Sequence, residues 1–168
     1  MYDGVVGRVL RRDAGDRDGR ELRARVRLMA GVGVEGDLGV RGAARRRRRG
    51  AGQVHLLPAE VLDEFAEAGH ELEPGELGEN VTTRGIDLAR LPLGTRLQLG
   101  AHAVVRLEGV RGVDGVRAGV FPRGMEGRVV RRAGVLAVVE STGFLSPGDA
   151  IRIRLPGLPY RPLPPVRP

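Results

Sequence analysis

Three residue types with distinctive side chains are missing from this chain of 168 residues, which has no cysteine, no tryptophan and no lysine. Without cysteine the chain has no disulfide, no thiolate zinc site, no iron–sulfur ligand and no persulfide carrier. The lack of lysine leaves arginine to supply all 28 basic residues, which indicates a compositional bias more than a function. Whatever chemistry the chain performs, no protein thiol of its own takes part.

Aromatic and hydroxyl side chains are scarce as well. Two tyrosines and three phenylalanines offer little surface for stacking nucleic-acid bases. The two serines, Ser141 and Ser146, do not lie in the glycine-framed turn that presents a nucleophilic serine. No glycine motif opens a helix directly after a strand, as it does in nucleotide-binding loops. These absences argue against nucleic acid as a partner, against serine hydrolases and against nucleotide binding.

The positive charge is concentrated in one segment. The net charge is +7, and five of the arginines form the run Arg45–Arg49, so the rest of the chain carries 7 − 5 = +2. The run lies in a glycine-rich stretch, residues 31–52, that predicts a long loop. A loop that folds over an anionic ligand is the functional interpretation, and a solvated loop is the alternative.

Short apolar stretches separated by glycine and proline predict a mainly β protein. The clearest strand is predicted over residues 21–29, where Leu22, Val26 and Leu28 fall on one side of the period-2 alternation. Further strands are predicted at residues 5–12, 53–57, 80–83, 96–99, 103–108, 127–130, 135–140 and 150–155. One ordinary helix is predicted from Pro58 to residue 68, with Gly69 at its end. This pattern favours a barrel over an α/β sheet.

The length predicts one domain, residues 1–156, followed by a proline-rich tail, residues 157–168. Proline has no backbone N–H, so we expect the tail to wrap the surface and not to enter a sheet interior. The first residues lack the apolar core of a signal peptide, and no stretch approaches the length of a membrane span. We therefore expect a cytoplasmic protein with no membrane partner.

Residues 74–88, which read PGELGENVTTRGIDL, resemble the signature of the MOSC family, the C-terminal domain of molybdenum-cofactor sulfurases. Similar segments follow one another in the family's order at residues 33–37, 53–57, 91–100, 133–135 and 147–151. The resemblance implies a MOSC-type antiparallel β-barrel with one or two short helices. It also implies a cleft for molybdenum cofactor, a pterin, which in metal-binding members is ligated by a cysteine thiolate.

The chain departs from the family where chemistry is expected. The family's Gly-Asp-x-His loop reads GDLG at residues 36–39, the arginine before Gln-Val is Gly52, and the Arg-Asn-Pro-Cys segment reads RGVD at residues 111–114. The expected histidine, arginine and cysteine are thus replaced, the last by Asp114. A retained scaffold with altered cleft residues is typical of a fold whose ancestral chemistry has been replaced.

Three carboxylates are candidates for acid–base catalysis, namely Asp114, Asp37 and Glu79. Asp114 stands in for the cysteine, and its alternative role is that of a turn residue in a Val-Asp-Gly sequence. Asp37 follows a strand and serves alternatively as an acceptor for loop amides. Glu79 lies in the best-matched motif, where a structural role is the alternative.

Arg111 is the foremost ligand-binding candidate, because a guanidinium suits bidentate recognition of phosphate or carboxylate. Its alternative is a solvent-facing strand end. Asn80, Arg84, Arg41 and His55 complete the predicted ligand-binding residues. Asn80 has a turn-stabilising role as its alternative, and His55 that of a packed strand histidine. No histidine–carboxylate spacing predicts a metal site, and two further histidines are expected at the surface.

These features together predict a divergent MOSC-domain enzyme that acts on a small anionic or polar metabolite by acid–base chemistry, as a lyase, isomerase or hydrolase. No cofactor is assigned to that activity. One alternative is a molybdenum-cofactor oxidoreductase or cofactor-handling protein, in which Asp114 or solvent replaces the thiolate and the resemblance implies molybdenum cofactor or a pterin. Another is a non-catalytic binding module that docks through Arg45–Arg49.

Overall fold

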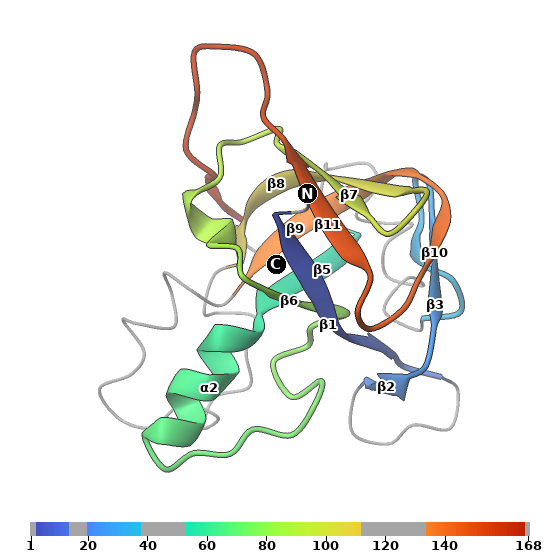
Figure 1. Ribbon diagram of the computed structural model, residues 1–168, viewed down its shortest axis with the longest axis vertical. Coiled ribbons are helices and arrows are strands. Elements are labelled where there is room, and N and C mark those ends of the chain that lie inside the picture. Colours follow the sequence, from blue (N-terminus) through green and yellow to red (C-terminus); the bar gives the residue numbers. More distant parts are fainter. Residues whose placement is uncertain (1–2, 14–19, 38–52, 112–133, 167–168) are drawn as a thin grey trace.

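The computed structural model describes residues 3–13, 20–37, 53–111 and 134–166. Seven strands close into a barrel in the order β11-β7-β8-β9-β5-β6-β1, and β1 pairs with β11 to complete the ring (Figure 1). The strands are β1 (Gly4–Arg11), β5 (Val54–Pro58), β6 (Val81–Arg84), β7 (Arg96–Leu99), β8 (Ala103–Arg111), β9 (Val135–Ser141) and β11 (Ala150–Arg154). All ring pairs are antiparallel except β5–β6. The predicted mainly β, barrel-type fold is confirmed.

A small second sheet lies beside the barrel and contains β10 (Gly143–Leu145), β3 (Val26–Met29) and β4 (Gly33–Val34). The prediction of one strand over residues 21–29 was wrong, because the chain changes sheets within it. β2 (Glu21–Arg23) pairs with the end of β1, and β3 pairs with β10 and β4. Leu22 consequently faces solvent, whereas Val26 and Leu28 are buried.

Most other predicted strands agree with the structure within a few residues. β6 begins at Val81, and β8 continues three residues beyond its predicted end to Arg111. The strand predicted at residues 127–130 lies outside the described residues. β4, β10 and β12 (Pro165–Val166) were not predicted, because strands of two or three residues carry too little periodicity to be recognised.

The helix α2 (Ala59–Glu67) covers the outside of the barrel next to β5 and β6. Pro58 precedes its first turn in extended conformation, and Gly69 follows it with φ +87°. Val61 and Phe65 are buried on the side of the helix that faces the barrel, whereas Ala66 is exposed. A 3-10 turn (Leu88–Arg90) is the other helical element among the described residues.

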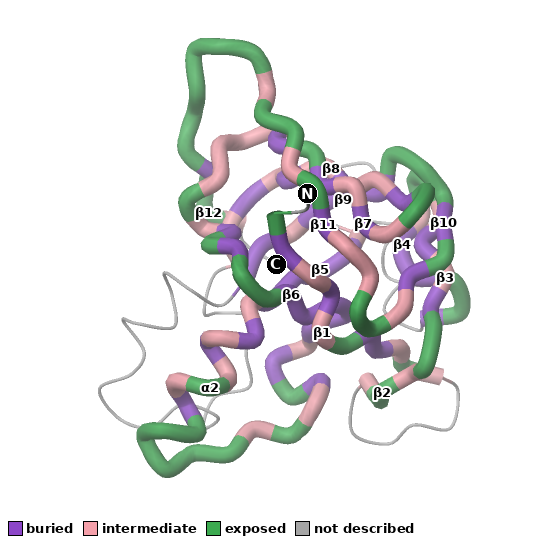
Figure 2. The backbone as a smooth tube through the Cα atoms, in the orientation of Figure 1, coloured by how far each residue is buried: buried purple, intermediate pink, exposed green. Residues whose placement is uncertain are grey.

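Two hydrophobic clusters hold these elements together. Figure 2 shows the buried residues along the backbone in purple. The larger cluster fills the barrel with side chains from every strand of the ring, and burial of each leucine or valine there contributes roughly 1.5–3 kcal/mol. The smaller cluster lies under the helix and contains Leu57, Val61, Phe65 and Leu77. Since Leu77 belongs to the segment 74–88, the helix holds that segment against the barrel.

Residues 157–162 of the proline-rich tail are exposed, and the described residues that follow return to the edge of the sheet. Leu93 donates its backbone N–H to the carbonyl of Arg161 at 2.7 Å, and Leu163 is buried. β12 then pairs in parallel with the end of β8. Its prolines are tolerated there because the position is a sheet edge. No helix of the described residues has the length and apolarity needed to cross a membrane.

Candidate functional site

Arg111 and His55 lie on two strands that flank β9, and their side chains meet. The Arg111 Nη1 atom lies 2.8 Å from His55 Nδ1 and donates to the carbonyl of Leu77 at 2.7 Å. Because a guanidinium only donates, Nδ1 of His55 must accept, so the neutral ring carries its proton on Nε2. The pair thereby joins β5 and β8 to the segment 74–88.

The imidazole of His55 occupies space that a glycine leaves. A Cβ atom on Gly134, just before β9, would lie 2.6 Å from His55 Nε2 and 2.3 Å from the carbonyl oxygen of Leu56. Gly134 also has φ +93°, a conformation that other residues adopt at a cost. His55 is buried, which agrees with the alternative role of a packed strand histidine. Its ring also contacts Arg111, and Arg111, His55 and the Leu77 carbonyl together form the Arg111 cluster.

Asn80 fixes the start of β6 between two neighbouring strands. The side-chain oxygen of Asn80 accepts the backbone N–H of His55 at 3.0 Å, and the backbone N–H of Asn80 donates to the backbone carbonyl of His55 at 2.9 Å. The backbone carbonyl of Asn80 accepts the backbone N–H of Leu10 at 2.7 Å. The His55 N–H requires an acceptor, so the orientation of the amide is determined. Its Nδ2 atom is then buried and has no hydrogen-bond partner in the part of the chain that the structure describes.

Glu79 is more deeply buried than Asp37, with 1% of its surface exposed. Oε1 accepts the backbone N–H of Gly75 at 2.8 Å, whereas Oε2 is buried without a partner among residues 3–13, 20–37, 53–111 and 134–166. Gly75 has φ +85°, and a Cβ there would lie 2.2 Å from the carbonyl oxygen of Arg20. A buried carboxylate oxygen that lacks a donor is costly, and a bound ligand can supply one.

Asp37 is paired with Arg20, a residue that the sequence did not single out. Arg20 Nη2 lies 2.9 Å from Asp37 Oδ2, and the backbone N–H of Arg12 donates to Oδ1 at 2.8 Å. Arg20 Nη1 donates to the carbonyl of Gly78 at 2.6 Å. Asp37 therefore anchors an arginine that holds the segment 74–88. This geometry gives Asp37 a positioning role, and its acid–base role stays a prediction.

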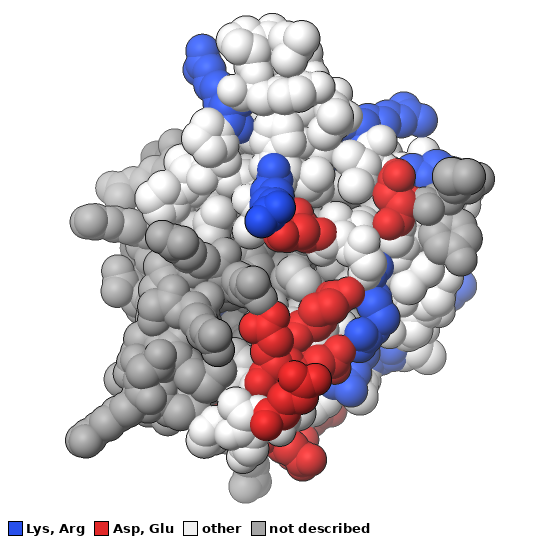
Figure 3. Space-filling view, turned by 60° about the vertical axis from the view of Figure 1, so that its left-hand side comes forward, with Lys and Arg blue, Asp and Glu red and all other residues white. Residues whose placement is uncertain are grey.

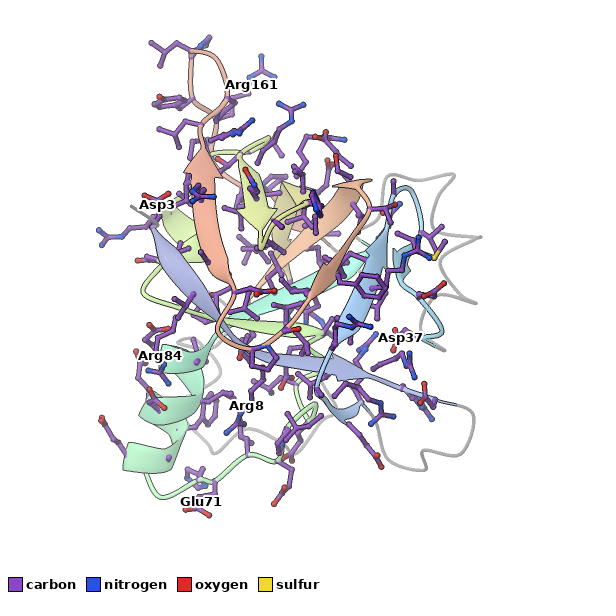
Figure 4. The ribbon with its side chains drawn as sticks, turned by 45° about the vertical axis from the view of Figure 1, so that its right-hand side comes forward. Asp3, Arg8, Asp37, Glu71, Arg84 and Arg161 are labelled. Atoms are coloured by element: carbon purple, nitrogen blue, oxygen red, sulfur yellow. The ribbon has the colours of Figure 1, made fainter. Side chains whose placement is uncertain are left out.

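Arg84 is not brought into this cluster. It pairs with Asp63 of α2 at 2.9 Å, and this hydrogen bond is the main cause that raises its pKa. Figure 4 shows Arg84 beside the helix and Asp37 on the far side of the barrel. Figure 3 shows that carboxylates gather on one face of the molecule, where α2 carries Glu60, Asp63, Glu64 and Glu67.

The structure does not test several of the other predicted residues. Asp114, Arg41 and the run Arg45–Arg49 are outside the described residues, so their roles stay predictions. His70 and His102 are exposed, as expected. Gly134 and Arg20 were missed because their importance depends on contacts with residues far away in the sequence. The only available signal was that Gly134 falls in a segment with family resemblance.

The comparison with known proteins agrees with this architecture. The family model of the MOSC domain matches the sequence over residues 43–152, and the chain therefore belongs to the MOSC domain family. Its structure is similar to that of the YuaD protein from Bacillus subtilis, with TM-score 0.72, 20% sequence identity and coverage of 94% of this chain and 100% of that one.

The structure is also similar to YiiM from Geobacillus stearothermophilus, with TM-score 0.62, 14% identity and coverage of 96% of this chain and 78% of that one. At these identities the likenesses establish the fold alone. No curated protein matches the chain.

Metal ligation of the family's thiolate type does not fit the residues of this chain. The sequence supplies no cysteine. Among the described residues, no three histidine, aspartate or glutamate side chains are grouped so that they could hold a metal ion. A carboxylate does not reproduce the softness of a thiolate ligand, so this chain does not offer the family's molybdenum–sulfur bond.

Proposed function

We propose that this MOSC-domain protein binds a small anionic or polar metabolite beside His55, Asn80 and Arg111, and acts on it by proton transfer without a metal–thiolate bond. One observation carries the proposal. Glu79 Oε2 and Asn80 Nδ2 are both buried and lack hydrogen-bond partners within the described residues. Leaving such a group unpaired costs about 1–3 kcal/mol, which a ligand of matching polarity would offset.

The two atoms define what the ligand must offer. Asn80 Nδ2 is a donor and needs an acceptor, such as a carboxylate, phosphate or carbonyl oxygen. Glu79 Oε2 is an acceptor when ionised and needs a donor, such as a hydroxyl or an acidic C–H or N–H group. A small hydroxylated acid combines both requirements. The helix face with four carboxylates is a poor place for such an anion, whereas the Arg111 cluster is a favourable one.

The proposed proton transfer assigns different roles to Glu79 and His55. Glu79 is the proton acceptor, because one of its oxygens is fixed by Gly75 and the other has unused lone pairs. His55 is held in one tautomer by Arg111, so it presents an N–H group at Nε2 and no base at Nδ1. Asp114 keeps its predicted acid–base role. A cytoplasmic location is part of the same proposal.

A thermal-shift screen with small carboxylates and phosphates tests the binding step. We expect at least one compound to raise the melting temperature saturably, with about 2.7 kcal/mol of stabilisation at a hundredfold excess over Kd. Asn80→Asp should abolish the shift, because it keeps an acceptor for the His55 N–H but replaces the unpaired donor with a charged oxygen. Arg111→Gln should weaken the shift as well.

Arg90→Gln is the matched control for Arg111→Gln. It removes the same charge from a side chain that is 88% exposed and lies on the 3-10 turn. Equal shifts in Arg111→Gln, Arg90→Gln and the wild type would overturn the proposed site. Turnover of the hit, followed by NMR, then separates an enzyme from a binding module, and unchanged ligand would remove the catalytic part of the proposal.

A further inference from the structure

Among the described strands, the end of β8 that carries Arg111 has a barrel neighbour on one side only. β9 pairs with β8 as far as Val110, whereas β7 pairs with it only between Ala103 and Arg106. Leu107 still exchanges backbone hydrogen bonds with Gly94 and Thr95, and the edge beyond it is covered by the C-terminal segment. Val110 donates its N–H to the carbonyl of Pro164 at 2.8 Å, and Val166 lies opposite Arg111.

Gly109 lets this segment lie close to β8, because it has no side chain. A Cβ atom at residue 109 would lie 2.1 Å from Cγ2 of Val166 and 2.6 Å from the carbonyl oxygen of Pro164. Any larger residue would therefore push the segment away from β8. The segment is anchored further back by the Leu93–Arg161 hydrogen bond and by the buried side chain of Leu163.

We propose that residues 161–166 are a positioning element of the site, which fixes the backbone of Arg111 so that its Nη1 reaches His55 Nδ1 and the Leu77 carbonyl. On the other side of the strand, the N–H of Arg111 donates to the carbonyl of Gly134 at 3.2 Å. Without β12 the described residues hold that end of β8 from one side only, and singly held strand ends open at low free-energy cost. The consequence for ligand binding rests on the proposed function, but the positioning of Arg111 does not.

Proline makes the segment suited to this role. Prolines at residues 162, 164 and 165 restrict the unbound chain to few conformations, so little entropy is lost when it lies against β8. The interaction changes no charge at the site. Its effect is therefore to orient Arg111, and displacement of the segment should alter the surroundings of His55 while the barrel core stays folded.

The test compares the wild type with Gly109→Ala and with a chain that ends after Leu163. The shortened chain keeps the buried Leu163 and the Arg161 contact but removes the Pro164 carbonyl and β12. Gly157→Ala is the matched control, because nothing lies within 4 Å of its added Cβ. The readout is the pair of ring-nitrogen shifts of His55 in long-range ¹H–¹⁵N NMR, which distinguish a fixed tautomer from an averaged one.

We expect one donor-type and one acceptor-type nitrogen in the wild type and in Gly157→Ala, and averaging toward a common shift in the other two variants. Inorganic phosphate, used as the anionic probe, should bind those two variants about tenfold more weakly. Adding Gly109→Ala to the shortened chain should have no further effect, since the atoms that it displaces are gone.

If the shortened chain folds and its His55 shifts are unchanged, the proposal is overturned. This test does not depend on whether Gly109→Ala folds. The two proposals fail separately. If the wild type binds no anionic probe while the His55 shifts still respond to loss of the segment, the proposed function fails and the positioning role stands.

Discussion

Arg111 Nη1 lies 2.8 Å from Nδ1 of His55, although the two residues are 56 positions apart in the chain. This contact spans β9 and ties the end of one barrel strand to the interior of another. The same nitrogen also binds the Leu77 carbonyl, and both of its hydrogens are thereby used. The segment with the strongest family resemblance is thus held by Arg111 at the Leu77 carbonyl and by Arg20 at the Gly78 carbonyl.

The contact between Gly134 and His55 predicts a large effect of one added methyl group. Gly134→Ala combines a positive φ with a Cβ that would lie 2.3 Å from a backbone oxygen and 2.6 Å from the imidazole. We expect a loss of about 3 kcal/mol or more in the free energy of unfolding by urea. Gly148→Ala is the control, since its φ is +89° but nothing lies within 4 Å. It should lose only about 1 kcal/mol, and equal losses would show that the contacts are unimportant.

The pair of Arg20 and Asp37 predicts non-additive effects. Arg20→Met leaves a buried carboxylate without its cation and should cost about 3–5 kcal/mol in the free energy of unfolding. The double variant Arg20→Met/Asp37→Asn should be more stable than Arg20→Met alone, because the neutral amide still accepts the N–H of Arg12. Arg90→Met, at an exposed position, should have little effect. A double variant less stable than Arg20→Met would contradict the assignment of Asp37 as an anchor.

Glu140 predicts a pH-dependent contribution to stability. Its pKa is lowered first by the hydrogen bond from Arg96, with burial opposing and Arg106 adding to the decrease. A carboxylate with a lowered folded-state pKa stabilises the fold above its unfolded pKa of about 4.3, and that stabilisation is lost as the pH falls through the folded pKa. Glu140→Gln should therefore be less stable than the wild type by about 0.5–1 kcal/mol at pH 7.

The difference for Glu140→Gln should disappear when urea unfolding is repeated at progressively lower pH. Glu71→Gln removes the same charge from an exposed residue after α2, and as the control it should be about as stable as the wild type at pH 7. A difference for Glu140→Gln that grows toward low pH would contradict the sign of the shift.

Removing the buried hydroxyl of Thr83 should stabilise the protein, unlike the substitutions above. Its hydroxyl is fully buried in β6 and has no hydrogen-bond partner within the described residues. Thr83→Val keeps the branched shape favoured in strands and removes the unpaired polar group. We expect the melting temperature to rise, by an amount that corresponds to about 1 kcal/mol. A decrease would mean that the hydroxyl has a partner such as an ordered water.

The sequence was sufficient to predict the barrel, but not the contacts among the candidate site residues. His55, Asn80 and Arg111 were all selected, since the family resemblance and their polar groups pointed to them. That Asn80 binds the backbone of His55, and that Arg111 binds its ring, depends on strands that meet only in three dimensions. The alternation in residues 21–29 misled for the same reason, since the period continues while the chain changes sheets.

Glycines that matter because their missing side chain leaves space for a neighbouring residue could not be recognised from the sequence. Gly109 and Gly134 matter because Val166 and His55 occupy the space beside them. A single sequence with 27 glycines gives no means of distinguishing these two from glycines in ordinary turns. Arg20 was missed because it follows a polar loop, where an arginine is usually solvated.

The most direct measurement follows the side-chain amide of Asn80, the only asparagine in the chain, in ¹H–¹⁵N NMR spectra during a titration with inorganic phosphate and malonate. The absence of its signals in Asn80→Asp makes the assignment, and the amides of Gln53 and Gln98 are internal references. We predict that the Asn80 NH₂ signals shift and saturate with the anion and that Arg111→Gln weakens this response. An Asn80 amide that does not respond, while either anion binds elsewhere on the protein, would contradict the proposed site.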